Sequence, residues 1–180
     1  MQSVTTAGRR RRTRAVGQAL TEFALVGPLL LILILGLLDG TMLMYSVGTT
    51  HYAVGEAARL GAASGSAPGS DAAMLKVIRD TVGTLTVFQV DEIDIYKLNQ
   101  DGGGNLSPDP TSYNKYRFDG TPMLSPEPWP AQARDTGNGT SDFMGVTIRY
   151  TYRFKAAILG FAAPLGLTAT SYIRLEPQSY

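Results

Sequence analysis

The chain has 180 residues, a formal net charge of +1 at pH 7 and no cysteine. This length allows about one domain, and the lack of cysteine excludes disulfides, iron–sulfur clusters, thiol catalysis and thiolate metal sites. The charge is unevenly distributed, because five arginines and no acid precede Gly17, whereas the rest of the chain is mildly acidic. The five are Arg9, Arg10, Arg11, Arg12 and Arg14.

A hydrophobic stretch follows the arginines directly. Residues 23–38 carry no charge, and weakly polar flanks interrupted only by Glu22 and Asp39 extend the stretch to the roughly 17–25 residues that cross a bilayer. A basic cluster before such a span predicts a single-pass protein of the bacterial cytoplasmic membrane, with the N-terminus cytoplasmic and the C-terminal part extracytoplasmic. A nucleic-acid-binding basic arm is the alternative. The adjoining apolar helix argues against it, so the expected partner is the lipid bilayer and not nucleic acid.

The leader differs from an ordinary secretory signal, which has small residues at a cleavage site beyond its apolar core. Residues 37–42 offer no such site, which also counts against a twin-arginine signal. Instead, Gly17 ends the basic leader before the core, and Glu22 follows five residues later. This arrangement resembles the type IV prepilin signal. The resemblance implies that a prepilin peptidase cuts between Gly17 and Gln18 and that the apolar helix is retained.

Glu22 has two interpretations. An acid inside an apolar span is costly and is usually paired or functional. In pilin-like filaments the implied partner is the new α-amino group of a neighbouring subunit, so that Glu22 would set the axial register. Alternatively, Glu22 lies at the headgroup boundary near a helix N-terminus, where the helix dipole favours an anion. Both can hold at different stages.

Three stretches, residues 17–30, 36–39 and 53–62, resemble the TadE family of tight-adherence (Flp pilus) pseudopilins. The order of the charged residues in the third stretch differs from the family pattern, and the family usually has a longer acid where Asp39 stands. The resemblance implies an accessory, or minor, pseudopilin that helps to assemble or display an adhesive filament. Its partners would be other pilins and the tight-adherence membrane machinery, with Glu22 and Asp39 as assembly residues.

The size of the C-terminal part favours an accessory role, because the major pilins of this system are far shorter. The rival hypothesis is a single-pass, membrane-anchored extracytoplasmic binding module that is neither processed nor polymerised. An enzyme is not expected, since the chain lacks a nucleophile elbow, a phosphate-binding glycine loop and any cysteine. His51 is the only histidine, and therefore no metal site or other cofactor is expected.

A helix is predicted over residues 18–64. Pro28 removes a backbone donor and clashes with the carbonyl of residue 24, which predicts a kink. Beyond Asp39 the helix is rich in glycine and alanine, which allow close approach of a neighbouring helix. The small residues would face either a partner helix or the protein's own sheet. We favour the sheet slightly, because pilin folds place one on this half of the helix.

The remainder, residues 65–180, is predicted as an α+β domain whose small antiparallel sheet packs on the long helix, as in pilins. Residues 71–82 show helical spacing of apolar side chains, and residues 84–98 form a strand with a bend or bulge at Asp91 and Glu92. Residues 146–155 and 165–176 alternate between apolar and polar side chains, which predicts an antiparallel pair of strands.

Two linking segments stand out. Residues 99–142 are rich in glycine and proline and are predicted as one long loop; the stretch 101–105 weakly resembles a calcium loop without its alternating ligands and terminal glutamate. The link Ala156–Pro164 is unusually apolar, and burying each of its large side chains would contribute about 1.5–3 kcal/mol. We expect the long helix to cover part of this link, with Phe161 left for a partner.

Overall fold

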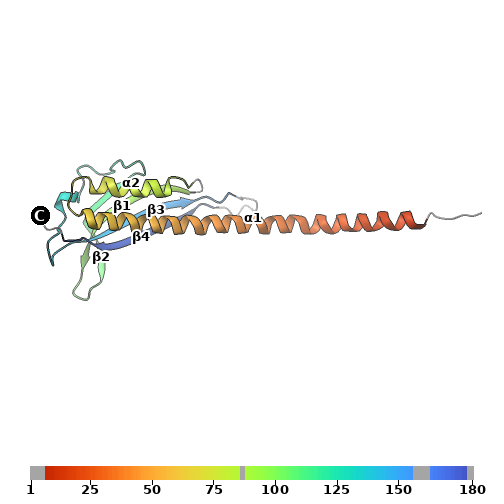
Figure 1. The fold of residues 1–180 in the computed structure, drawn as a ribbon, viewed down its shortest axis with the longest axis horizontal. Helices are drawn as coiled ribbons and strands as arrows, with labels where there is room; N and C mark the ends of the chain where they lie inside the picture. The colour runs from red at the N-terminus through yellow and green to blue at the C-terminus, as the bar shows by residue number, and fades with distance from the viewer. Residues whose placement is uncertain (1–6, 86–87, 156–162, 178–180) are drawn as a thin grey trace, which may run out of the picture.

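The computed structural model describes residues 7–85, 88–155 and 163–177. Two α-helices, four β-strands and one short 3-10 helix follow one another along these residues. They are α1 (Ala7–Ser64), α2 (Ser70–Val82), β1 (Phe88–Gln100), β2 (Leu106–Tyr116), η1 (Ala131–Ala133), β3 (Phe143–Tyr152) and β4 (Leu165–Arg174). The half of α1 that precedes the domain projects from it as a single rod (Figure 1).

The long helix α1 has 58 residues and begins at Ala7, earlier than the predicted start at residue 18. The arginines and alanines of the leader favour helix, so nothing local stops the helix before the span. Pro28 lies inside this helix, and the kink expected there stays a prediction. The helix ends at Ser64 as predicted, where Gly65 adopts a φ of 49°, the left-handed conformation common just past a helix end.

The four strands form one antiparallel sheet in the order β2-β1-β3-β4. Strands β3 and β4 pair from Phe143↔Arg174 to Tyr152↔Leu165, which confirms the predicted pair. The pairing of β1 with β3 shifts register between Val90 and Glu92, which confirms the predicted bulge. The α+β class is therefore confirmed.

Both helices cover the same face of the sheet (Figure 1). The predicted apolar side of α2 is buried, and so are the alternate side chains of β3 that were expected to face inward, except Phe154, which lies beyond the strand end and is partly buried. Strand β4 is buried less evenly than its alternation predicts, because it lies at the sheet edge. Ala169 is fully buried in β4, whereas Leu165 is 38% exposed.

The prediction of a single long loop over residues 99–142 was wrong. Strand β1 continues to Gln100, strand β2 occupies Leu106–Tyr116, and η1 follows. Pro108 and Pro110 concealed the strand in the sequence, because proline cannot donate to a ladder. The edge position of β2 tolerates them. Most of the apolar link between β3 and β4, residues 156–162 with Phe161 among them, lies outside the residues that the structure describes. The prediction that α1 covers part of this link, with Phe161 left for a partner, therefore stays a prediction.

Candidate functional site

The candidate site is the exposed length of α1, and it begins at the leader junction. The Gly17–Gln18 peptide lies inside the helix, where the Thr21 hydroxyl donates to the carbonyls of Gly17 at 3.2 Å and Gln18 at 2.8 Å. The Gln18 amide donates to Glu22 Oε1 at 3.1 Å. A glycine inside a helix costs about 1 kcal/mol relative to alanine, so Gly17 is a locally weak point. The proposed cleavage peptide therefore follows a residue that helices tolerate poorly.

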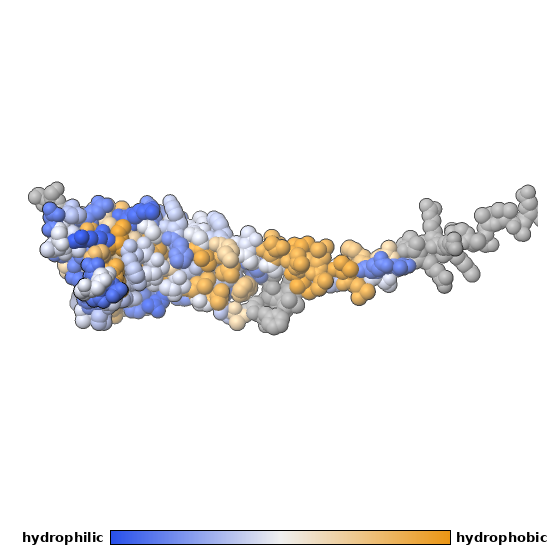
Figure 2. Space-filling model, turned by 90° about the horizontal axis from the view of Figure 1, so that it is seen from below, coloured by the Kyte–Doolittle hydropathy of each residue, from blue (hydrophilic) through white to orange (hydrophobic). Residues whose placement is uncertain are grey.

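The hydrophobic span presents its side chains outward. Gly17–Ser64 is the one helix among the described residues that is long and apolar enough to cross a membrane. Phe23 is 73% and Leu25 is 79% exposed, and most of the large apolar side chains up to Leu38 are similarly uncovered. Figure 2 shows this apolar surface as a continuous band along the rod. The described part of the domain leaves this surface uncovered, so it is available to lipid or to another chain.

Asp39 ends the span, and its side chain turns toward the domain instead of outward. It is 7% exposed. The Tyr152 hydroxyl donates to the Asp39 carbonyl at 3.1 Å, and the Lys155 backbone N–H donates to Asp39 Oδ1 at 3.1 Å. Burial, together with the nearby Asp39 charge, raises the pKa of Tyr152. Asp39 therefore fixes the end of β3 to α1, and its predicted assembly role stays a prediction beside this structural one.

Beyond Asp39 the small residues of α1 divide between two faces. Ala53, Ala57 and Ala58 are fully buried against α2 and the sheet. A Cβ on Gly61 would meet Met74 Sδ at 2.3 Å and Met144 Cε at 2.5 Å, so a larger residue here would force two buried methionine side chains to move. The structure therefore places one set of small residues against the protein's own sheet, as we favoured from the sequence.

The opposite face of α1 carries small residues that the domain does not need. A Cβ on Gly40, Gly48 or Gly55 would meet no atom within 4 Å. Tyr45 is 64% and Tyr52 is 62% exposed beside them. Tyrosines and glycines thus recur together at a seven-residue spacing, the period at which one helix face packs along another. We call this surface, made by Tyr45, Gly48, Tyr52 and Gly55, the outer stripe.

A buried polar cluster lies at the start of α2, and no pattern in the sequence predicted it. Arg134 forms an ion pair with Asp71 and lies over the Trp129 ring, 4.6 Å from its centroid. Tyr116 donates to Asp71 Oδ2 at 2.7 Å, and burial together with the Asp71 charge raises the pKa of Tyr116. The cluster holds the segment after β2 onto α2 and so is structural.

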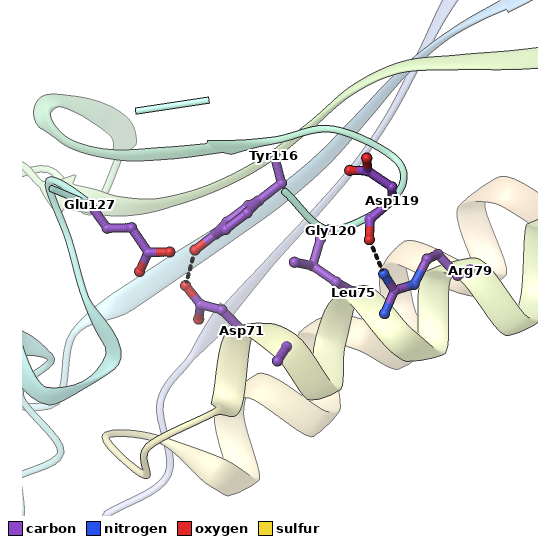
Figure 3. A pocket seen from close by; sticks show the side chains of 8 residues that line it. Asp71, Leu75, Arg79, Tyr116, Asp119, Gly120 and Glu127 are labelled. Carbon is purple, nitrogen blue, oxygen red and sulfur yellow. Dashed lines mark hydrogen bonds between the residues drawn. The ribbon is translucent and has the colours of Figure 1, made fainter. Parts of the chain in front are cut away.

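A cavity of about 170 Å³ adjoins this cluster (Figure 3). Its polar walls are Asp71, Arg79, Tyr116, Asp119 and Glu127. Figure 3 shows the Arg79 guanidinium on the Asp119 backbone and the Tyr116 hydroxyl on Asp71, so several of its polar groups are already paired within the chain. The described residues hold no cluster of three metal-ligating side chains, and the cavity has no nucleophile–base pair.

The face of the sheet away from the helices carries a second polar cluster. Asp94 is fully buried there, and its Oδ2 accepts from the Tyr113 hydroxyl at 2.9 Å and from Arg149 Nε at 3.2 Å. Burial raises the pKa of Asp94, and burial beside the Asp94 charge raises the pKa of Tyr113 to about 12. Tyr96 stacks on Tyr113 with ring centroids 4.6 Å apart. These contacts cover the outer face of the sheet with the chain's own side chains.

The part of the chain that is similar to a known family lies within α1. Residues 17–59 match the family model described as TadE-like protein. This match covers the leader junction, the span, Asp39 and the outer stripe. The chain matches no curated protein and no solved structure. The matched segment is therefore the TadE-like part of the chain, and it coincides with the part of α1 that carries the candidate site.

Proposed function

We propose that this TadE-like chain is an accessory pseudopilin of a tight-adherence pilus, cut between Gly17 and Gln18 by a prepilin peptidase and assembled through α1. The family match supports a role in biogenesis of this kind of pilus. In this proposal the N-terminus is cytoplasmic, the domain is extracytoplasmic, and the bilayer holds the span until the subunit joins the filament.

The observation that carries the proposal is the exposed Glu22 five residues after Gly17. Its described hydrogen bond comes from the Gln18 side chain. Cleavage after Gly17 would create an α-amino group on Gln18. The Glu22 carboxylate of the next subunit would then be able to pair with that amine in an apolar setting, where the Coulomb attraction between the two charges is least screened. The outer stripe supplies the surface along which two α1 helices would pack.

The rival function, an unprocessed membrane-anchored binding module, uses the same span but needs neither Glu22 nor the outer stripe. Mass spectrometry of the mature chain from its native host separates the two. A mature N-terminus at Gln18 supports the pseudopilin, and recovery of the chain with residues 1–17 attached supports the anchored module.

A second experiment tests the role of Glu22. We expect Glu22→Ala to leave membrane insertion and the melting temperature of the domain unchanged and to abolish pilus assembly in a strain lacking the wild-type gene. The matched control is Asp80→Ala, which removes an exposed acid from α2, outside the span and away from the outer stripe; its surface ion pair with Lys76 contributes little. Normal piliation with Glu22→Ala would instead support the headgroup-boundary interpretation.

A further inference from the structure

The end of the domain nearest the span carries basic and apolar side chains together. Arg153 and Lys155 follow β3 and are exposed, and Pro164 and Leu165 lie exposed at the start of β4. We call these four residues the proximal edge. Tyr152 pairs with Leu165 across the two strands, which keeps the two parts of the proximal edge together.

The position of the proximal edge along α1 is fixed by Asp39. The Lys155 N–H and the Tyr152 hydroxyl both bond to Asp39, which directly follows the last residue of the uncharged stretch. The proximal edge therefore lies at the level of residue 39 on α1. It cannot move away from that level without breaking both hydrogen bonds.

The length of the uncharged stretch brings this level into the lipid headgroups. The residues from 23 to 38 span about 24 Å as a helix, whereas the hydrocarbon core is about 30 Å thick and the headgroup layers extend the bilayer to about 40–45 Å. The uncharged stretch is therefore shorter than the hydrocarbon core. At whichever end the difference falls, residue 39 lies in the headgroup layer or deeper, toward the hydrocarbon core. The proximal edge then lies within reach of lipid phosphates.

The charge of the proximal edge suits an anionic partner. Within the described residues, neither Arg153 nor Lys155 forms an ion pair, whereas Lys97, Lys115 and Arg149 on the same sheet all do. Arg153 donates to the neutral side chain of Gln89 at 3.3 Å. The nearby carboxylate of Asp91 accepts from the Thr151 hydroxyl at 2.7 Å.

We propose that the proximal edge binds anionic phospholipid headgroups, with Arg153 and Lys155 on the phosphates and Leu165 at the boundary with the acyl chains. Basic side chains beside a membrane reach the headgroups while their aliphatic stems stay against apolar surface, and anionic lipids attract them electrostatically. The proposal needs α1 to span a membrane and is independent of leader cleavage and of pilus assembly. A chain that proves to be uncut would still be expected to bind lipid in this way.

The test uses the full chain in nanodiscs of phosphatidylcholine, with or without phosphatidylglycerol, and with a quencher on the lipid headgroup. The chain has no cysteine, so a fluorophore is attached at Thr168→Cys on exposed β4, or at Ser107→Cys on exposed β2 as the distant reference. We expect quenching at position 168 to rise with phosphatidylglycerol and quenching at position 107 to stay unchanged.

The double variant Arg153→Gln/Lys155→Gln should remove the part of the quenching that depends on phosphatidylglycerol, since each basic residue near an anionic surface strengthens the attraction about fivefold. The matched control Arg59→Gln/Lys76→Gln also removes two exposed positive charges, here from the helices, and should retain it. Melting temperatures equal to that of the wild-type chain show that both variants are folded. Equal quenching in the two lipid compositions, or unchanged quenching in the Arg153→Gln/Lys155→Gln variant, would overturn the proposal.

Discussion

The parts of α1 before and after Asp39 belong to one uninterrupted helix but differ in what covers them. Before Asp39 nearly every large apolar side chain is exposed. After it, one face is closed by the chain's own α2 and sheet, and the outer stripe lies on the face that is left open. Helix formation is therefore common to both parts, whereas tertiary packing is confined to the second. The comparison separates residues that fold the domain from residues that await lipid or another chain.

The largest expected effect comes from Gly61, where the covered face is tightest. Gly61→Ala should destabilise the domain by about 1–3 kcal/mol, because the new methyl group collides with Met74 and Met144. Thermal unfolding measured by circular dichroism would detect this change. An unchanged melting temperature would mean that the two methionines move aside freely and that the covered face is not closely packed.

At the boundary between the two parts, Asp39→Ala should destabilise the domain by about 1 kcal/mol, since the Lys155 N–H loses its acceptor while Tyr152 keeps the backbone carbonyl. Hydrogen exchange at Lys155 should accelerate while exchange in α2 stays unchanged. Asp39→Asn keeps an acceptor oxygen and serves as the control. Exchange at Lys155 that stays as slow in the Ala variant as in the wild-type chain would contradict a role for the Asp39 side chain.

On the open face of α1, replacing glycine with alanine should raise the stability of the chain instead of lowering it. Gly48→Ala adds a methyl group that meets nothing within 4 Å, so it should stabilise the helix by about 0.5–1 kcal/mol. If the outer stripe packs against a second helix, the same variant should nevertheless weaken pilus assembly. Melting temperature and piliation are measured together. Improved stability with full piliation would show that the stripe faces solvent or lipid and not another helix.

The smallest expected effect concerns the outer face of the sheet. Burial raises the pKa of Asp94, so the folded state binds its proton more readily than the unfolded state does. The Asp94 contribution to stability should therefore fall as the pH rises from the ordinary pKa of 3.8 through the raised folded value. Asp94→Asn should flatten the dependence of unfolding free energy on pH in that range. Parallel curves for the two proteins would contradict the shift.

Much of the fold could be predicted from the spacing of apolar and polar residues along the sequence. The alternation at Val146, Ile148 and Tyr150 predicts the buried face of β3, and the acidic pair at Asp91 and Glu92 predicts the bulge in β1. These succeed because local sequence and tertiary burial agree there. The strand β2 was missed because tolerance of its prolines depends on an edge position that only the assembled sheet defines.

The candidate site could be predicted from the sequence only in part. Gly17 and Glu22 are recognised from their spacing relative to the apolar span, which is a local pattern. The contact of Asp39 with Tyr152 and Lys155 joins residues 113 and 116 positions apart, and no local pattern reports such a pair. The division of small residues between Gly61 and Gly48 likewise depends on which face the domain covers.

The domain packs along α1 between Asp39 and Ala62 and is hydrogen-bonded to it at both ends; the Ala62 carbonyl accepts from the Glu176 N–H at 3.1 Å. Between them lie 22 residues of uninterrupted helix, about 33 Å of rod. A pull on the domain is therefore shared as shear along this part of α1 before it reaches the membrane segment. If α1 tilts at Asp39, the domain tilts with it, so the same stretch of helix transmits both load and orientation.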